Sequence, residues 1–495
     1  MDNMYIRGEA KEANLEDQPV LIVNSGRYIT TDTYFGCFSG NVYNENTNLK
    51  LVRACVTLTG KGSVRLMKIN SGTVDELVSE EAYDDTHVKT VQLDFLPSDS
   101  CYYLSIESKK NTRIFNVYYE GEGILRETRI AIIICTYRRE AIVQNNLRNL
   151  YMAISSSEEL KKSVDVFCID NGCTLNEVPK SFKLIPNRNF GGSGGYARGM
   201  IEAKEYTHLW LMDDDIKFDS SIIQRAVSFL KFRNSDGIKL AAGMFSFEEP
   251  TIQKEATGIF NGYTFKSNAS GLNFEKRGSL LKNCIQQRAN MYGGWWSLIF
   301  PKTEYLPMPF FIKLDDIEYG LRSVDDGRYV IMNGFGVWHE AFGNKANAWS
   351  EYYTTRNTLI VQSMYPHLNH NYRKMMRIRL LKSLAYGESK CMGAALQGVI
   401  DYLEGPEKFS AINPETRHKE IMMDYGAPLV SNMTRGRMLV EALKHINKPD
   451  SRVSILLYKE ALEMMKRMRS LKQNWKWLAT EEFWKGYLGL DSQNK

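Results

Sequence analysis

Three consecutive aspartates follow an apolar run in LWLMDDDIKFD, residues 209–219. Asp213 and Asp215 lie two residues apart, so on an extended or turning backbone both carboxylates could bind one divalent cation. Such a cation could in turn hold a diphosphate. The triplet therefore predicts a metal site, and a solvated acidic turn is the alternative.

A histidine far downstream could complete this ligand set. GVWHEAFGNK, residues 336–345, places His339 directly after an apolar strand. Two carboxylates and one imidazole, with further oxygens from a diphosphate, suit Mn²⁺ or Mg²⁺ better than zinc. The alternative is a histidine that is simply satisfied in the core or at the surface.

A second acidic pair occurs in PFFIKLDDIEYGLR, residues 309–322, where Asp315 and Asp316 begin a predicted helix. The helix dipole favours carboxylates in a first turn, so N-capping explains one of the two. The other is spare. In a cleft beside the metal site it could act as a general base that deprotonates an incoming hydroxyl.

Two glycine-rich segments lie between these acidic groups. NRNFGGSGGYARG, residues 187–199, allows close backbone approach to a phosphate, although it is neither a P-loop nor a dinucleotide fingerprint, and a flexible turn is the alternative. MYGGWWSLIF, residues 291–300, carries Trp295 and Trp296. Adjacent residues of a strand face opposite sides, so we expect at least one tryptophan to line a cleft where it stacks on a sugar, unless a bend packs both into the core.

Continuous apolar strands are predicted at 129–135, 164–170 and 207–213, with helical segments between them. This pattern indicates an α/β fold with a parallel sheet. Such sheets bind ligands beyond the carboxyl ends of their strands. Thr136, Arg138, Asp170 and Asp213 all fall at such ends, which predicts one site along this edge.

The regions on either side have different patterns. From about residue 18 to 121, apolar and polar residues alternate in short runs such as 91–95, 104–107 and 115–119, which predicts short strands in an antiparallel β-sandwich. After about residue 360 the chain becomes helical and basic. Packing within the chain or oligomerisation would explain those helices, and a membrane-surface role suggested by Trp475, Trp477 and Trp484 is the alternative.

Bulk properties exclude several classes of protein. With 495 residues the chain is long enough for two or three domains, and 63 Lys+Arg against 58 Asp+Glu is too balanced for a dedicated nucleic-acid binder. The N-terminal residues do not resemble a secretory signal, and no run of about 18 apolar residues occurs. We therefore expect a cytoplasmic protein, whose 8 scattered cysteines are reduced.

Taken in order, CTYRRE, CIDNG, NRNFGGSGG, LMDDD, GGWW, KLDDIEYGLR and VWHEAFG resemble the inverting GT-A glycosyltransferases of family 2. More closely, the chain is similar to the processive galactofuranosyltransferases of mycobacterial galactan synthesis. The resemblance implies a β-sandwich at 1–125, a Rossmann-like GT-A catalytic domain at 126–360 and a helical domain at 361–495.

The resemblance also implies roles for individual residues. Asp213, Asp215 and His339 would bind Mn²⁺ or Mg²⁺, and Asp316 would be the catalytic base. In the donor site, Asp214 would lie toward the sugar and Arg356 near the diphosphate, and uridine would be held by Thr136, Arg138, Asp170 and Asn189. The acceptor would be held by Asp315, Trp295 and Trp296.

By this resemblance the substrates would be UDP-galactofuranose and a growing glycan, which could be lipid-linked and bring the C-terminal region to the inner face of the cell membrane. Single displacement would give a β-linked product. A rhamnosyltransferase or other family-2 enzyme is the alternative, because Asp170 would read thymine as well as uracil. A carbohydrate-binding protein without activity is a third, more remote interpretation, and the presence of every ligand and the base argues against it.

Overall fold

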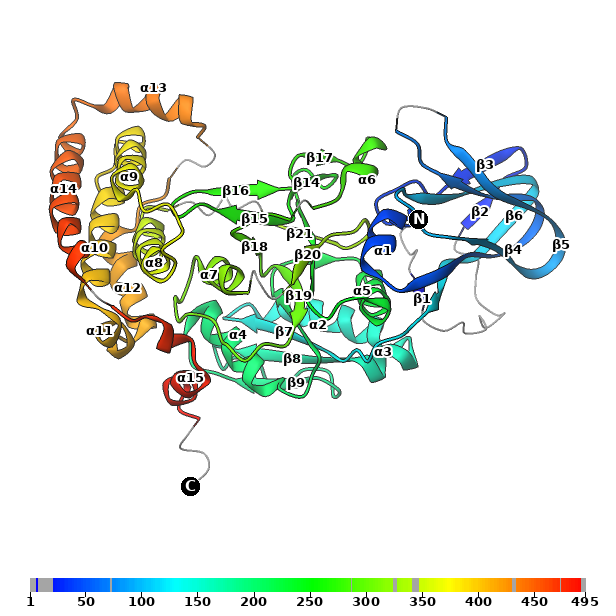
Figure 1. Cartoon of the computed structure of the whole chain (residues 1–495), viewed down its shortest axis with the longest axis horizontal. Helices are drawn as coiled ribbons and strands as arrows, with labels where there is room; N and C mark the ends of the chain where they lie inside the picture. Colours follow the sequence, from blue (N-terminus) through cyan, green and yellow to red (C-terminus); the bar gives the residue numbers. More distant parts are fainter. Residues whose placement is uncertain are drawn as a thin grey trace.

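The computed structural model describes residues 6–7, 21–71, 74–285, 287–323, 327–340, 347–429, 433–471 and 473–490. A β-rich N-terminal region is followed by a mixed α/β region and then by a helical region (Figure 1). The α/β region lies between the other two in this view. The predicted mixed α/β class is therefore confirmed.

The N-terminal region forms one six-stranded sheet built on three long strands. Its elements are β1 (Ile6–Arg7), β2 (Leu21–Val23), β3 (Arg27–Thr30), α1 (Gly40–Asn46), β4 (Leu49–Lys68), β5 (Glu76–Phe95) and β6 (Tyr102–Gly123). Pairing is antiparallel except between β1 and β6. The prediction of short strands is wrong, because the runs at 104–107 and 115–119 both belong to β6. The two-layer sandwich stays a prediction.

Local irregularity explains why these strands are long. The register of β4 shifts around Gly60, whose φ is 119°. Such a bulge bends a strand and increases its twist without ending it. The break between the runs at 104–107 and 115–119 therefore lies within one continuous strand, whereas the break after 91–95 is a turn between β5 and β6.

A seven-stranded sheet with the order β20-β12-β19-β10-β7-β8-β9 forms the centre of the molecule. The strands predicted from apolar runs are β7 (Ile130–Thr136), β8 (Val164–Asp170) and β10 (His208–Asp213), which run parallel. The other strands of this sheet are β9 (Lys183–Pro186), β12 (Ile238–Ala241), β19 (Ser297–Pro301) and β20 (Arg328–Val330). The helices of this part of the chain are α2 (Glu140–Ser155), α3 (Glu158–Ser163), α4 (Gly191–Glu202) and α5 (Ser221–Phe232).

Two smaller sheets extend this layer. The five-stranded sheet contains, in order, β11 (Lys217–Phe218), β21 (Gly336–His339), β13 (Gly243–Ser246), β14 (Ile252–Glu255) and β17 (Leu272–Asn273). The three-stranded sheet contains β16 (Phe265–Asn268), β15 (Thr257–Phe260) and β18 (Met291–Gly293). Helix α6 (Gly278–Lys282) connects β17 to β18 and so joins the two smaller sheets, whereas α7 (Asp315–Arg322) lies between β19 and β20 of the central sheet.

The C-terminal region is helical, as the sequence predicts, and packs around an apolar core that it shares with residues of the α/β region such as Phe260 and Leu321. It comprises α8 (Ser350–Met364), α9 (Tyr372–Tyr386), α10 (Lys390–Glu404), α11 (Pro406–Ala411), α12 (Pro414–Tyr425), α13 (Arg435–His445), α14 (Pro449–Lys466), η3 (Arg467–Ser470), η4 (Lys476–Ala479) and α15 (Glu481–Leu488). No helix in the described ranges is long and apolar enough to cross a bilayer.

Two of the three tryptophans that suggested a membrane surface, Trp475 and Trp484, are buried. Trp475 is 1% exposed and Trp484 is 0% exposed. The Trp484 indole donates to the Pro307 carbonyl at 2.8 Å, so it ties α15 to the segment that follows β19. Membrane contact through Trp475 and Trp484 is therefore a wrong prediction, because both rings are buried in apolar packing. Contact through Trp477, which is half-buried, stays a prediction.

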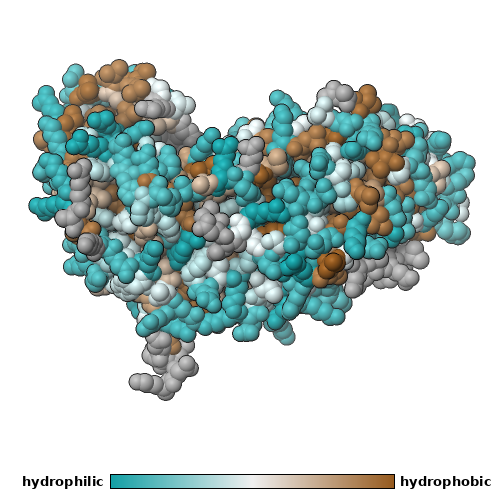
Figure 2. All heavy atoms as spheres, viewed as in Figure 1, coloured by the Kyte–Doolittle hydropathy of each residue, from teal (hydrophilic) through white to brown (hydrophobic). Residues whose placement is uncertain are grey.

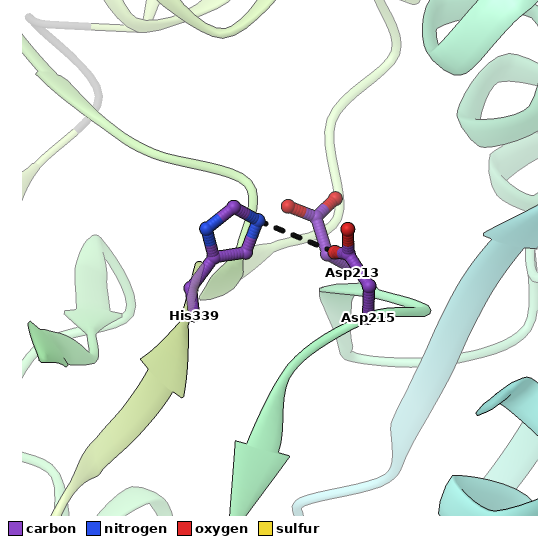
Figure 3. Close-up of side chains that lie close together, drawn as sticks. All are labelled: Asp213, Asp215 and His339. Carbon is purple, nitrogen blue, oxygen red and sulfur yellow. Dashed lines mark ion pairs between the residues drawn. The ribbon is translucent and has the colours of Figure 1, made fainter. Parts of the chain in front are cut away.

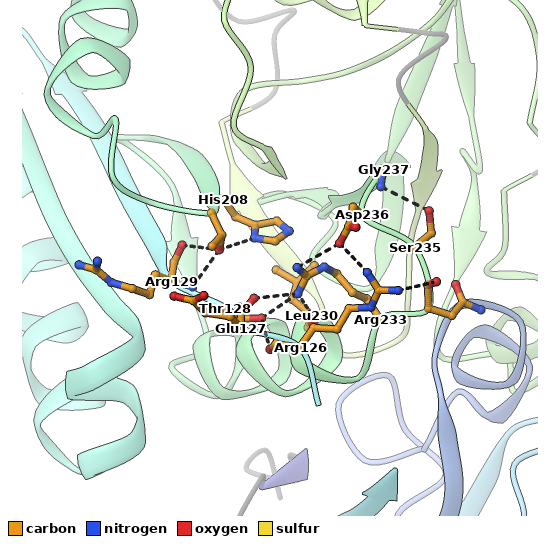
Figure 4. Close-up of polar contacts among 12 residues, drawn as sticks. Arg126, Glu127, Thr128, Arg129, His208, Leu230, Arg233, Ser235, Asp236 and Gly237 are labelled. Carbon is orange, nitrogen blue, oxygen red and sulfur yellow. Dashed lines mark hydrogen bonds and ion pairs between the residues drawn. The ribbon is translucent and has the colours of Figure 1, made fainter. Parts of the chain in front are cut away.

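The segment that joins the first two regions is held by a buried arginine at the end of α5 (Figure 4). Arg233 Nη1 donates to the Glu127 carbonyl at 3.2 Å and to Thr128 Oγ1 at 2.9 Å. Its Nη2 reaches Asp236, which also pairs with Arg126. This network fixes the path by which the chain leaves the N-terminal sheet and enters β7.

Candidate active site

The carboxyl ends of three parallel strands place polar side chains along one edge of the central sheet. Thr136 of β7 lies opposite Asp170 of β8, and Asp213 of β10 lies opposite Cys135 of β7. Register alone therefore puts Thr136, Asp170 and Asp213 beside one another. This is the position at which open α/β sheets bind ligands.

Asp213, Asp215 and His339 form a compact cluster at this edge (Figure 3). One ligand atom from each residue lies within 4.8 Å of the others. His339 Nε2 is 3.2 Å from Asp215 Oδ1. A hydrogen bond from Nδ1 to the Glu340 carbonyl, 2.5 Å away, would leave the Nε2 lone pair directed toward the carboxylates.

Strand pairing brings His339 to the triplet. Two residues after Asp215 the chain enters β11, where Lys217 pairs with Trp338 of β21. The other edge of β21 pairs with β13, so that Ser246 lies opposite His339. The imidazole is thus held by a strand that is fixed on both sides.

Burial and like charge affect the protonation of this cluster. The pKa of Asp213 is raised to about 6, first by burial and then by the neighbouring Asp215 carboxylate, whereas His339 opposes the shift. Burial lowers the pKa of His339, but its hydrogen bond and charge interaction with Asp215 outweigh this effect, so the pKa is raised overall. The three groups therefore favour a bound positive charge.

The middle aspartate points away from the cluster. Asp214 is buried, and its carboxylate accepts hydrogen bonds from Thr136 Oγ1 and Arg139 Nη1, both at 2.7 Å. Arg139 also contacts Asp215 Oδ2 at 2.8 Å. The predicted places of Asp214 beside the sugar and of Thr136 beside uridine stay predictions, and the observed contacts give both a role in orienting the triplet.

Sequence reasoning missed several groups that fix the triplet. Arg139 is the second arginine of CTYRRE, and only the first, Arg138, was selected. Asn146 of α2 donates to the carbonyls of Asp214 and Ile216, both at 2.9 Å. Tyr196 of α4 donates to Asp213 Oδ1 at 3.0 Å. A tyrosine inside the glycine-rich segment was the only sequence signal for this last contact.

The predicted uridine-binding residues lie on the same edge but differ in their exposure and in the hydrogen bonds that hold them. Asp170 is 1% exposed and accepts hydrogen bonds from the backbone N–H groups of Gly172, Thr174 and Leu175. Arg138 is exposed, with a φ of 54° and its guanidinium over the Tyr137 ring. Asn189 accepts from the Gly191 N–H at 3.1 Å.

Asp315 and Asp316 begin α7, as the sequence predicts. Asp315 Oδ2 accepts a hydrogen bond from Ser193 Oγ at 3.1 Å, which joins α7 to the glycine-rich helix α4. Burial raises the pKa of Asp316 well above its usual value, and the Asp315 carboxylate adds to the shift. A carboxylate with a raised pKa is a stronger base once it is ionised.

A third carboxylate, missed from sequence, lies near this pair. Glu255 at the end of β14 accepts from Tyr292, and its charge also raises the pKa of Asp316. Burial raises the pKa of Glu255 itself to about 7. The residue terminates a short strand with no distinguishing motif, so only tertiary packing identifies it.

The two tryptophans face different cores, as expected for adjacent strand residues. Trp296 belongs to the core beneath the sheet and donates to the Ala242 carbonyl at 3.1 Å. Trp295 packs edge-on against Tyr196 and Tyr319. Trp295 is 5% exposed and Trp296 is 6% exposed, so neither lines an open cleft in this structure. Their contact with an acceptor stays a prediction.

Arg356 is buried rather than free to meet a diphosphate. Its guanidinium donates to Tyr352 Oη at 2.8 Å, to Asn357 Oδ1 at 2.9 Å and to the Phe310 carbonyl at 3.2 Å. It also lies over the rings of Tyr353 and Phe409. Its predicted role beside the diphosphate stays a prediction, and these contacts show that it braces the loop before α7.

Two curated relatives match most of the chain. Galactofuranosyltransferase GlfT2 of Mycobacterium tuberculosis is 25% identical over 450 residues, which cover 81% of this chain and 69% of the relative. The protein of the same name from Mycolicibacterium smegmatis is 25% identical over 454 residues, covering 81% and 68%. The chain is a glycosyltransferase. It resembles GlfT2 across the segments that carry the acidic clusters.

No protein-family model matches this glycosyltransferase. Among solved structures, GalNAc-T7 with UDP, GalNAc and Mn²⁺ aligns with 50% of this chain and 49% of its own, at 10% identity. The TM-score of 0.35 is too low to establish a shared fold. The resemblance to GlfT2 and the geometry of the site are therefore the basis for assigning a reaction.

Proposed function

We propose that this glycosyltransferase has a GT-A catalytic domain and transfers galactofuranose from UDP-galactofuranose to a hydroxyl of a growing glycan, with inversion and a β-linked product. The observation that carries the proposal is the convergence of Asp213, Asp215 and His339 at the strand edge, all within 4.8 Å. The names of the two relatives support galactofuranose as the sugar.

The ligand atoms of this cluster fit a hard divalent cation. Two carboxylates and one imidazole suit Mn²⁺ or Mg²⁺ when substrate oxygens complete the shell. When bound, the cation supplies positive charge that offsets the charge on the leaving diphosphate. Arg139 and Tyr196 hold the Asp215 and Asp213 carboxylates in place for that role.

Asp316 would remove the acceptor proton on the face opposite the leaving group. Single displacement then inverts the anomeric centre, so an α-linked donor gives a β-linked product. The bond from Ser193 to Asp315 supports this role, because it holds the base helix against α4. Asp315 and, after local opening, the tryptophans would hold the acceptor. The Trp295 indole N–H is buried without a hydrogen-bond partner, which supports a polar ligand there.

The donor nucleotide would lie over Thr136, Arg138, Asp170 and Asn189. A carboxylate has about four lone-pair positions, and Asp170 uses three for backbone N–H groups, which leaves one for a uracil imide. Exposed Arg138 would face the nucleotide. We also propose the domain limits 1–125, 126–360 and 361–495, which agree with the change in element type along the chain.

We propose that the acceptor is lipid-linked and that the C-terminal region contacts the inner face of the cell membrane through α13 rather than through the tryptophans. Leu439, Val440, Leu443 and Ile446 form one exposed face at helical spacing. Exposed basic residues Arg437, Lys444 and Lys448 flank it. Apolar side chains ringed by lysine and arginine are typical of helices that lie on anionic membranes. Figure 2 shows hydrophobic residues over α13. Oligomerisation stays a prediction.

Product analysis tests the reaction. The chain is incubated with UDP-galactofuranose, Mn²⁺ and a short synthetic galactofuranoside, and the products are examined for linkage and chain length. We expect β-galactofuranosyl products, with repeated addition if the enzyme is processive. Turnover with dTDP-rhamnose but not with UDP-galactofuranose would overturn the sugar assignment and leave the fold intact.

Asp316→Asn is the matched variant for this assay. We expect transfer to fall by at least about a hundredfold, because general-base catalysis contributes about that much, whereas calorimetry should show unchanged UDP binding. Unchanged turnover would remove Asp316 from the mechanism. Loss of UDP binding as well would indicate a folding defect rather than loss of the base.

A further inference from the structure

The segment immediately before the base helix has an unusual backbone. Phe311, Lys313 and Leu314 have φ values of 66°, 70° and 64°. Left-handed backbone is disfavoured for residues with a Cβ and persists only where surrounding structure imposes it. Since Leu314 is followed directly by Asp315 and Asp316, whatever imposes this conformation also sets the direction in which α7 begins.

One buried amide on α8 contacts the backbone of this segment. Asn357 is 0% exposed. Its Nδ2 donates to the Ile312 carbonyl at 3.1 Å and to the Lys313 carbonyl at 2.8 Å. Its Oδ1 accepts from Arg356 Nε at 2.9 Å, which fixes the orientation of the amide. Every polar atom of this side chain is therefore committed to the loop or to the arginine that orients it.

The opposite side of the loop rests on the glycine-rich segment. A Cβ on Gly191 would lie 2.0 Å from the Phe311 carbonyl oxygen, and the Gly192 N–H donates to that oxygen at 3.1 Å. Gly191 has a φ of 72°, a further reason for glycine there. The loop is thus clamped between α8 on one side and the segment that leads into α4 on the other.

We propose that Asn357 is a positioning residue for the transfer reaction: it holds the loop at 311–314 in its left-handed conformation and so keeps Asp316 aligned with the donor site. This inference rests on the proposed role of Asp316. Asn357 does not touch the reacting atoms, and it acts through the loop backbone. Displacement of a catalytic group by about 1 Å costs up to about a hundredfold in rate.

The test compares Asn357→Leu with Gln362→Met. Gln362 is a matched control because it lies on the same helix, is 3% exposed and donates its amide to two backbone carbonyls, those of Gly262 and Asn369, away from the loop. Both variants lose buried hydrogen bonds and should lose comparable stability in thermal unfolding. Only Asn357→Leu should lower kcat, by about ten- to a hundredfold, with an unchanged Kd for UDP.

Hydrogen exchange of the backbone amides gives a readout that does not depend on the donor sugar. We expect faster exchange across 309–320 in Asn357→Leu and wild-type exchange there in Gln362→Met. Wild-type exchange and kcat in Asn357→Leu, or equal losses of kcat in both variants, would overturn the positioning role. If the wild-type chain transfers no galactofuranose, the proposed function fails, and exchange alone still decides whether Asn357 holds the loop.

A rescue experiment separates positioning from general damage. Glycine adopts positive φ without the cost of a Cβ, so Lys313→Gly should reduce the need for the clamp. We expect Asn357→Leu/Lys313→Gly to recover kcat by about tenfold relative to Asn357→Leu, after correction for the effect of Lys313→Gly alone. No recovery, together with unchanged exchange across 309–320, would contradict the proposal.

Discussion

At the scale of single residues, the side chains of the aspartate triplet point in two directions. Asp213 and Asp215 face His339, whereas Asp214 faces Thr136 and Arg139. Each outer carboxylate also has one fixed partner, Tyr196 or Arg139. Side chains that are already held would need little reordering to bind a cation, which supports the proposed metal site.

The ligand assignment predicts a shared effect of two variants. Asp213→Ala and His339→Ala should each weaken Mn²⁺-dependent UDP binding by about ten- to a hundredfold, because each removes one ligand. Calorimetry with and without Mn²⁺ measures the change. His370→Ala, which removes an imidazole that bonds to the Tyr365 carbonyl, is the control. Wild-type affinity in either test variant would exclude that residue as a ligand.

Glu255 predicts a dependence of stability on pH. Burial raises its pKa from 4.5 to about 7, so the folded protein favours the protonated form. The contribution of protonated Glu255 to the free energy of unfolding is fully present below about pH 4.5 and is lost as pH rises through about 7. The loss amounts to about 3 kcal/mol.

Glu255→Gln removes this titration. We expect the variant to be stabilised relative to wild type at pH 8 and to differ little from it at pH 4.5, measured by thermal unfolding. Equal shifts at both pH values would contradict the assignment, because they would reflect altered packing instead of ionisation.

At the scale of elements, most of the site depends on where strands and helices end. β7, β8 and β10 end at one edge, β11 begins just after the triplet, and α7 begins at the second acidic pair. The loop before α7 carries three residues in left-handed conformation, each costing about 1 kcal/mol or more. The strained residues directly precede Asp315, whose carboxylate accepts a hydrogen bond from Ser193 of α4.

The junction at the end of α5 gives a prediction at this scale. Arg233→Met leaves the Glu127 carbonyl and the Thr128 hydroxyl without their buried donor, which should destabilise the protein by about 2 kcal/mol. Arg126→Met removes a partner of the same Asp236, but its side chain is 34% exposed, so the loss should be below about 1 kcal/mol. Urea unfolding measures both, and equal losses would refute the junction model.

At the scale of the whole molecule, the α/β region lies between the β-rich and the helical region (Figure 1), and it shares a buried apolar core with each of them. Tyr137 beside the predicted donor site donates to Glu415 of α12 at 3.2 Å. The Trp484 ring fills the core beneath α4. The helical region therefore helps to build the site, and removing it should disturb more than membrane contact.

The exposed face of α13 predicts membrane binding. The full chain should float with vesicles containing anionic lipid, and Leu439→Glu/Leu443→Glu should abolish flotation, because it places charge in the proposed contact. Leu77→Glu/Val78→Glu is the matched control, since these residues are 50% and 38% exposed in the distant N-terminal sheet. A wild-type chain that does not float, or a test variant that floats as well as the control, would refute the contact.

Some elements of the fold could be predicted from the sequence and others could not. Strands β7, β8 and β10 were predicted to within one residue, because a buried parallel strand requires an unbroken apolar run. The length of β6 was not, because bulges allow a strand to continue through polar positions that resemble turns. Burial of Trp475 and Trp484 was also missed, since amphipathic spacing does not reveal which partner covers an apolar face.

The sequence by itself determined which chemical groups are available and in what order: the triplet after a buried strand, the acidic pair at a helix start and the distant histidine. These are local patterns, set by the period of strands and helices. Only the tertiary structure decided which groups meet. His339 reaches the triplet through pairing of β11 with β21, and Arg139, Tyr196, Glu255 and Asn357 join the site through packing between segments far apart in the chain. Contacts across such separations depend on how whole elements pack, and no local spacing encodes that.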